Sequence, residues 1–125
     1  AAPDKVVLTL VGDGGFGTNP SCIATAVEQN IPVIWIVMNN SAFGTIAGLE
    51  YANYSTRFGT TFHTPDGASY TPNWAEIAKG YGIPVLGKLP IEPKLAECVD
   101  NGNIEGFEGD WLNNGVEQII NSTQD

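Results

Sequence analysis

Two short turns, each at the end of an apolar run, carry the residues with the clearest chemical potential. Residues 6–11 are followed by the stretch Gly12-Asp13-Gly14-Gly15-Phe16-Gly17, and residues 31–38 are followed by Asn39-Asn40. Asp13 offers a carboxylate and Asn40 a side-chain carbonyl, both hard oxygen ligands that Mg²⁺ accepts together with phosphate oxygens and water. The two turns therefore predict a divalent-metal site if the fold brings them together.

The glycines of the first turn add a second signal. They leave backbone N–H groups accessible beside a helix N-terminus, which favours a phosphate-like anion. However, residues 6–54 contain no Lys or Arg, and Asp13 would repel an anion. A divalent metal resolves the conflict, because it neutralises both partners. The sequence is thus compatible with a diphosphate bridged to the protein by a metal.

The apolar runs predict how these turns are positioned. Both runs are uncharged and rich in aliphatic side chains, which is typical of strands buried on both faces. Between them, Asn19 is a good N-cap and Pro20 a good first helical residue, so we expect a helix over residues 20–29. Strand, helix and strand at this spacing predict a right-handed crossover with parallel strands. Both turns then lie at the carboxyl edge of the sheet, where ligands bind.

The rest of the chain continues the alternation less clearly. We expect a short helix beginning within residues 47–58, a loop over residues 60–72 and a turn at 65–67. A helix over residues 71–80 is capped by Thr71 and opened by Pro72, with Trp74, Ile77 and Ala78 facing the sheet. Further expected elements are a strand near residues 81–86 and helices over 93–99 and 111–120. The predicted fold is α/β, a three-layer doubly wound parallel sheet with helices on both faces.

The two turns together resemble the cofactor fingerprint of thiamine-diphosphate-dependent enzymes. The resemblance lies in Gly12-Asp13-Gly14 and in Asn39-Asn40, and Ser41-Ala42-Phe43-Gly44-Thr45-Ile46 is also in the style of this family. It is closest to the branch that holds acetolactate synthase, benzoylformate decarboxylase, pyruvate oxidase and cyclohexane-1,2-dione hydrolase. The similarity covers roughly residues 6–86 and fails from about Lys88.

This resemblance implies a set of site residues. Asp13, the side chain of Asn40 and the main-chain carbonyl of Ala42 would ligate Mg²⁺ or Ca²⁺. The implied cofactor-binding residues are Gly12, Asp13, Gly14, Gly15, Asn40, Ala42, Phe43 and Gly44. At Ile46, pyruvate decarboxylases of this pattern carry a catalytic Glu, whereas an aliphatic residue fits carboligases and benzoylformate-type enzymes. Ile46 cannot transfer protons, so we expect it to shape a substrate pocket, and no catalytic residue is assigned.

The resemblance also implies a reaction class and partners. The expected enzyme makes or breaks C–C bonds next to a carbonyl, by 2-oxo acid decarboxylation or carboligation as in acetolactate synthase, or by cyclohexane-1,2-dione hydrolase-like cleavage. The cofactor performs the difficult chemistry and the protein positions it. Family members need a pyrimidine-binding domain across a subunit interface. Residues 1–125 are therefore expected to be the diphosphate-binding domain of a larger homodimeric or homotetrameric enzyme, inactive alone, whose FAD, if any, is bound elsewhere.

Two rival interpretations use the same residues. Gly12, Gly14 and Gly17 match a dinucleotide fingerprint, which would indicate a nicotinamide- or flavin-dependent oxidoreductase. That fingerprint requires an acid after the second strand, where this chain has Asn39-Asn40, and Asp13 would face the pyrophosphate. In a purely structural alternative, the glycines serve tight turns and Asp13 and Asn40 cap helices. The joint spacing favours metal and diphosphate over both.

Composition narrows the partners further. The chain has 125 residues and a net charge of −9, which argues against nucleic acid and anionic membranes, and no apolar run has the ~18 residues of a membrane span. Cys22 and Cys98 lack metal-ligand spacing and are expected to be free thiols. Without a visible signal peptide, we expect a cytoplasmic location. Arg57 and His63 are expected at the surface, with contact to a substrate carboxylate as the alternative.

Overall fold

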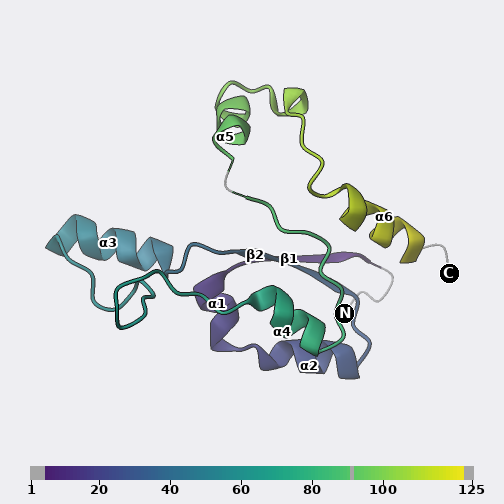
Figure 1. The fold of residues 1–125 in the computed structure, drawn as a ribbon, viewed down its shortest axis with the longest axis horizontal. Helices are drawn as coiled ribbons and strands as arrows, with labels where there is room; N and C mark the ends of the chain where they lie inside the picture. Colours follow the sequence, from purple (N-terminus) through teal and green to yellow (C-terminus); the bar gives the residue numbers. More distant parts are fainter. Residues whose placement is uncertain (1–4, 91, 123–125) are drawn as a thin grey trace. The chain divides into compact units, whose positions relative to one another are not determined.

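The computed structural model describes residues 5–90 and 92–122. The chain divides into two compact units, Ala1–Tyr81 and Gly82–Asp125. In chain order, the elements are β1 (Val7–Gly12), α1 (Asp13–Thr18), α2 (Ser21–Glu28), β2 (Val33–Met38), α3 (Gly44–Tyr54), α4 (Trp74–Gly80), α5 (Pro93–Asp100), η1 (Ile104–Gly106) and α6 (Asn113–Ser122) (Figure 1).

The first unit is built on the predicted strand, helix and strand. β1 and β2 pair in parallel, with Val7 opposite Val33 and Gly12 opposite Met38. An α/β fold with parallel strands is thus confirmed. Within the described residues the sheet contains these two strands. The three-layer, doubly wound arrangement and the single domain over residues 1–125 stay predictions.

The two faces of the sheet differ in burial. Leu8, Leu10, Ile36 and Met38 share one face, and their side chains are 63%, 64%, 45% and 55% exposed. On the other face Thr9 and Trp35 are half-buried and lie beside residues of α2. The expectation that both strands are buried on both faces is therefore wrong for the described residues. An apolar run indicates that a strand can be buried on both faces. Whether it is buried depends on other elements that pack against those faces.

The glycine-rich stretch after β1 is a helix, which corrects the predicted turn. Glycine disfavours helices by about 1 kcal/mol per residue, so this sequence alone argues for a loop. Tertiary packing overrides that preference, because Phe16 is buried and its ring contacts the Trp74 ring edge-on at 5.2 Å between centroids. Gly17 has no side chain to push the Trp74 indole away, since a Cβ there would lie 3.2 Å from it. The glycines of α1 therefore allow close packing of helices.

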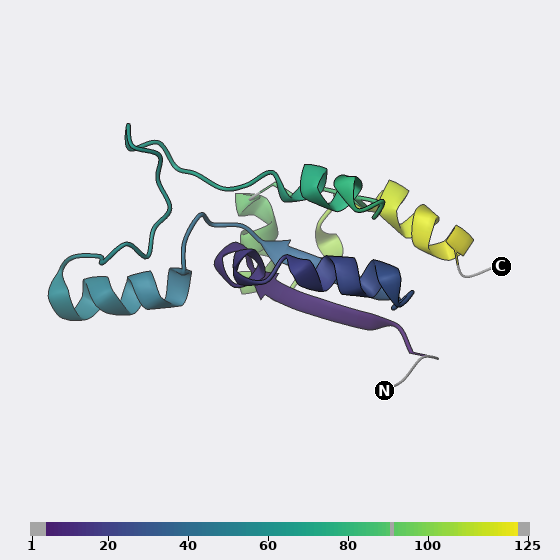
Figure 2. The same ribbon diagram turned by 90° about the horizontal axis from the view of Figure 1, so that it is seen from below.

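α2 and α3 follow the sequence pattern more closely. α2 covers Ser21–Glu28, as predicted within one residue at each end, although Pro20 is its N-cap and not its first helical residue. α3 covers Gly44–Tyr54, so it begins three residues before the expected range, and it ends at Ser55 in the left-handed conformation. α3 lies away from the two strands in both views (Figures 1 and 2), and Ala47 is its buried residue.

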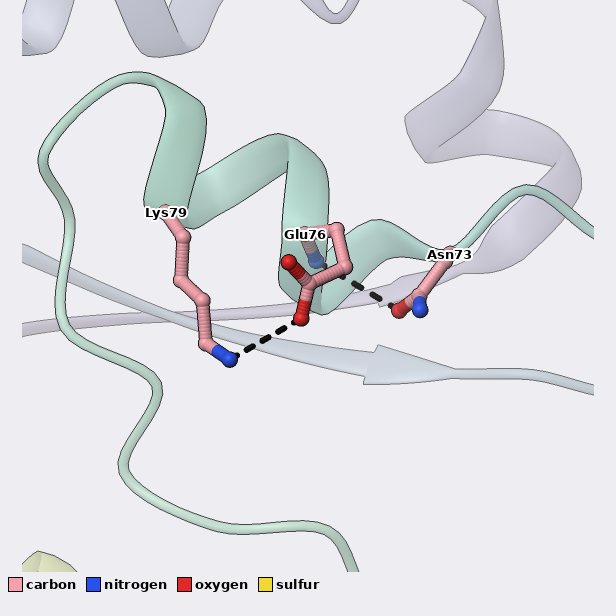
Figure 3. A network of polar contacts seen from close by, with 3 residues as sticks. All are labelled: Asn73, Glu76 and Lys79. Carbon is pink, nitrogen blue, oxygen red and sulfur yellow. Dashed lines mark hydrogen bonds and ion pairs between the residues drawn. The ribbon is translucent and has the colours of Figure 1, made fainter.

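The predicted helix near residue 71 begins later than expected. Asn73, not Thr71, is the N-cap of α4, and its side-chain oxygen accepts a hydrogen bond from the Glu76 N–H at 3.4 Å (Figure 3). Glu76 also pairs with Lys79 at 2.9 Å on the exposed side. Pro72 therefore precedes the helix. The prediction had placed Trp74 against the sheet, but its ring packs against α1.

The loop before α4 forms as predicted over residues 60–72. Its turn is closed by a hydrogen bond from the Gly67 N–H to the Thr64 carbonyl at 2.8 Å.

In the second unit, the predicted helices are confirmed as α5 and α6, although α6 begins at Asn113. The strand expected near residues 81–86 is wrong, since those residues form no strand. Pro84 cannot donate to a ladder, and no described strand pairs with this segment.

None of the described helices is long and apolar enough to cross a membrane.

The cap of α4 gives a first testable prediction. Replacing Asn73→Ala removes the side-chain acceptor of the Glu76 N–H and leaves that N–H its bond to the Asn73 carbonyl at 3.0 Å, so the free energy of unfolding should fall by about 0.5–1 kcal/mol. Asn73→Asp keeps an acceptor and should stay close to wild type. Urea denaturation of the three proteins measures the difference. An unchanged midpoint for Asn73→Ala would show that the cap contributes nothing.

Candidate metal centre

The structure brings Asp13 and Asn40 together at one edge of the sheet. Gly12 lies opposite Met38 in the parallel register, so Asp13, one residue after β1, and Asn40, two residues after β2, lie at the same edge. The Asn40 backbone N–H donates to Asp13 Oδ1 at 3.4 Å. Asp13 is 1% exposed whereas Asn40 is exposed, so the contact is partly buried. The geometric expectation for these two residues is met.

The second carboxylate oxygen of Asp13 has no protein partner. Asp13 Oδ2 is buried and makes no hydrogen bond. Among the described residues, the ion pair found joins Lys79 and Glu76 in α4 and does not involve Asp13. A buried, uncompensated carboxylate costs several kcal/mol, so a bound cation would stabilise such a group. An orphaned, buried oxygen beside Asn40 fits a hard cation.

The ligand atoms available at this site indicate which metal it could bind. Within residues 5–90 and 92–122, no group of three or more His, Cys, Asp or Glu side chains gathers to hold a metal. The predicted set has one carboxylate, with an amide oxygen and a main-chain carbonyl as its other members. Such all-oxygen sets suit Mg²⁺ or Ca²⁺ bound together with ligand oxygens, and they do not suit zinc.

The turn after Asn40 is held by backbone hydrogen bonds to residues 60–62. Ser41 adopts a positive φ of 54°, and its N–H donates to Asn39 Oδ1 at 3.2 Å. The Phe43 N–H donates to the Thr60 carbonyl and the Phe62 N–H to the Ser41 carbonyl, each at 2.8 Å. These two bonds flank an antiparallel bridge between Ala42 and Thr61. The Ala42 backbone is therefore held between two hydrogen bonds.

Glycines at two predicted positions allow this turn to approach α1 and Asn40. A Cβ on Gly14 would lie 2.7 Å from Phe43 Cδ1 and 3.2 Å from Phe62 Cζ, and these two rings pack edge-on at 5.2 Å. A Cβ on Gly44 would lie 2.5 Å from Asn40 Nδ2. Only glycine fits at either place without a shift of its neighbours.

Three predicted residues lie farther from this contact set. Gly12 is the N-cap of α1, and Gly15 is exposed, where a Cβ would lie 3.3 Å from the Val11 side chain of β1. Ile46 lies in the first turn of α3 and is 51% exposed. The structure thus gathers Asp13, Gly14, Asn40, Phe43 and Gly44 most tightly, with Ala42 within the same turn.

The sequence patterns missed Glu50 and Thr60. Glu50 Oε2 accepts hydrogen bonds from Thr60 Oγ1 at 2.6 Å and from the Phe58 N–H at 3.0 Å. The Thr60 hydroxyl and then the Phe58 N–H hold the pKa of Glu50 below its usual 4.5. One signal was available in the sequence, since Glu50 is the single charged residue of α3.

Arg57, His63 and Cys22 are exposed, and Cys98 is half-buried. The Arg57 guanidinium lies 5.0 Å from the centre of the Tyr51 ring, and exposed His63 contacts Thr61 Oγ1 through Nε2 at 3.0 Å. Their expected surface position is met, and contact with a substrate stays a prediction. Cys22 and Cys98 are free thiols, as expected.

An open groove of about 360 Å³ lies elsewhere in the first unit. It runs between α2 and the sheet, and Thr9, Cys22 and Trp35 are among its lining residues. Neither Asp13 nor Asn40 lines it. The buried polar contacts, and not this groove, therefore define the candidate centre.

Comparison with known families decides which family these features belong to. Residues 1–104 match the model described as the C-terminal TPP-binding domain of thiamine pyrophosphate enzymes. The chain belongs to this family. Domains of this family bind thiamine diphosphate. The resemblance seen in the sequence is therefore confirmed.

Several similar proteins carry the name 3D-(3,5/4)-trihydroxycyclohexane-1,2-dione hydrolase. The protein from Bacillus velezensis is 37% identical over 100 residues, which covers 80% of this chain and 16% of the relative. The protein from Lacticaseibacillus casei is 37% identical over 138 aligned residues, covering 98% of this chain and 22% of the relative. The chain thus spans about a fifth of the length of these relatives. No solved structure matches it significantly.

The close approach at Gly14 gives a second prediction. Gly14→Ala places a methyl group 2.7 Å from the Phe43 ring and should lower the free energy of unfolding by about 1–3 kcal/mol. Gly48→Ala is the matched control, because a Cβ there meets nothing within 4 Å. It should raise stability by about 0.5–1 kcal/mol through helix propensity. Urea denaturation compares them, and a gain in both variants would contradict the packing at Gly14.

Glu50 gives a prediction on pH. Because its pKa is lower in the folded chain than the usual 4.5, its charged form stabilises the fold above that pH. This contribution is lost as pH falls through the folded-state pKa. Wild type should therefore lose stability relative to Glu50→Gln on going from pH 7 to pH 3, in urea denaturation at both values. A difference between the two proteins that does not change with pH would contradict the assignment.

Proposed function

We propose that this chain holds the metal-diphosphate end of thiamine diphosphate within a larger enzyme that breaks a C–C bond next to a carbonyl. The observation that carries the proposal is the buried Asp13 carboxylate. One of its oxygens takes the Asn40 N–H and the other has no protein partner. A cation at this point offsets a buried negative charge that nothing else in the described part of the chain neutralises.

Each site residue has a distinct role in this proposal. Asp13, the Asn40 side chain and the Ala42 carbonyl would hold Mg²⁺, or Ca²⁺ in its place. The diphosphate would lie beside the backbone of Gly12, Gly14, Gly15 and Gly44, and beside Phe43, whose own N–H already donates to the Thr60 carbonyl. Magnesium keeps near-octahedral geometry and retains several waters or phosphate oxygens, so a small protein ligand set suffices. No catalytic residue is assigned to this chain.

The protein's contribution in this proposal is to position the cofactor. When bound, thiamine diphosphate supplies a carbanion that attacks a carbonyl carbon. The edge-on rings of Phe43 and Phe62 cover Gly14 and would keep water from the metal-bound end. Ile46, at the start of α3, would shape the neighbouring substrate pocket.

The similar proteins favour a cyclic 1,2-dione as the substrate class. Their printed name describes hydrolysis of a trihydroxycyclohexane-1,2-dione, and they are up to 37% identical to this chain. Hydrolytic cleavage of such a ring is therefore preferred to acetolactate synthase-like decarboxylation or carboligation. The aliphatic Ile46 is the feature that still favours the carboligase class.

The remaining assignments concern the larger protein. A pyrimidine-binding domain of the same family would complete the site across a subunit interface, in a cytoplasmic homodimer or homotetramer. The two-stranded sheet would then extend into a three-layer, doubly wound domain over residues 1–125. FAD, where relatives use it, would bind outside this chain. These residues alone would be inactive.

Removal of the Asp13 carboxylate tests the proposal. In the full-length protein, calorimetry with thiamine diphosphate should show binding that requires Mg²⁺. Asp13→Asn should weaken that binding by roughly a hundredfold or more, since even outer-shell changes cost 10–100-fold. Asp100→Asn, at an exposed position in α5, is the matched control and should bind as wild type does. Metal-independent binding, or tight NAD binding, would support the dinucleotide alternative.

A further inference from the structure

We propose that Glu50 is a positioning residue for the candidate metal centre. It fixes the loop segment 58–62, and that segment sets the position of the Ala42–Phe43 turn beside Asp13. The inference rests on the proposed function, because that turn carries a ligand assigned there. Three successive contacts support it, and Glu50 itself touches none of the proposed ligands.

The first contact joins α3 to the loop. Glu50 Oε2 accepts hydrogen bonds from Thr60 Oγ1 at 2.6 Å and from the Phe58 N–H at 3.0 Å. Thr60 is 9% exposed, so its hydroxyl would be left buried and unpaired without Glu50. An unsatisfied buried hydroxyl is costly, and bonds to a charged acceptor are stronger than neutral ones. One carboxylate oxygen therefore holds both ends of residues 58–60.

The second contact joins the loop to the turn. The Thr60 carbonyl accepts the Phe43 N–H, and the Ser41 carbonyl accepts the Phe62 N–H, each at 2.8 Å. Ala42 and Thr61 form the bridge between these bonds. Thr60 thus uses its side chain toward Glu50 and its backbone toward Phe43. Any displacement of Thr60 moves the backbone on both sides of the Ala42 carbonyl.

The third contact joins the turn to the helix that begins with Asp13. The Phe43 and Phe62 rings pack edge-on over Gly14, where even a Cβ would lie 2.7 Å from Phe43 Cδ1. These rings therefore cannot shift toward Gly14 without displacing α1. Thr60, Phe43 and Gly14 therefore transmit the position of Glu50 to the residue beside Asp13.

A merely structural Glu50 predicts a different behaviour. In that case its loss would lower global stability and leave the native turn unchanged in the folded molecules. A positioning Glu50 predicts local loosening at Phe43 and Phe62 and weaker metal-dependent binding in protein that is still folded. The exchange pattern in Glu50→Ala separates the two cases, and Gln at this position is the conservative control, since its amide oxygen accepts the same two hydrogen bonds.

The first test is amide hydrogen exchange on the full-length protein, for wild type, Glu50→Ala, Glu50→Gln and the control Glu28→Ala. Glu28 lies exposed at the end of α2. In Glu50→Ala, exchange at the Phe43 and Phe62 amides should rise about tenfold relative to the strand amides of β1 and β2. Glu50→Gln and Glu28→Ala should keep wild-type protection. A uniform rise at all amides would overturn the proposal.

The second test is calorimetric titration with Mg²⁺ and thiamine diphosphate on the same proteins. Glu50→Ala should bind about tenfold more weakly, and Glu50→Gln should restore the affinity. Thr60→Val should behave like Glu50→Ala and Thr60→Ser like wild type, which covers the case in which Glu50→Ala does not fold. Unchanged affinity and unchanged Phe43 protection in both damaging variants would overturn the proposal. Absence of metal-dependent binding in wild type would instead overturn the proposed function, while hydrogen exchange still decides whether Glu50 orders the turn.

Discussion

A buried negative charge without a protein counter-charge is the constraint on which the first unit depends. Asp13 is 1% exposed, one of its oxygens accepts a single long hydrogen bond, and the other is unpaired. Such a group is unfavourable in the interior unless a cation compensates it. The fold keeps this carboxylate at the edge where two parallel strands end, which is where ligands of α/β proteins bind. Its position therefore supports the proposed cation site.

Around Asp13, the backbone of several glycines lies close to the side chains of other residues. Gly14 admits the Phe43 and Phe62 rings, Gly17 admits the Trp74 indole, and Gly44 admits the Asn40 amide. In each case a methyl group would collide with its neighbour or crowd it. The glycines whose spacing predicts a phosphate-binding loop are thus packing residues in the structure, and the proposed phosphate contact would favour the same residue type.

Several elements show where sequence patterns succeed and fail. The parallel strands and α2 were predictable, because uncharged aliphatic runs and a local cap are properties of neighbouring residues. The helix at Asp13–Thr18 was not, because Phe16 and Trp74 are far apart in sequence and their contact outweighs glycine's low helix propensity. The expected strand near residue 83 failed for a related reason, since a strand requires a partner that local sequence does not supply.

The sequence by itself determined which residue types the candidate centre contains: a carboxylate and a carboxamide after successive apolar runs, glycines between them, and no Lys or Arg in residues 6–54. It also determined the family, since these spacings are what family comparison detects. Only the tertiary structure decided that Asp13 Oδ2 is buried and unpaired, and that Glu50 and Thr60 hold the turn at Ala42. Burial and long-range hydrogen bonds depend on residues that are distant along the chain, so no local pattern records them.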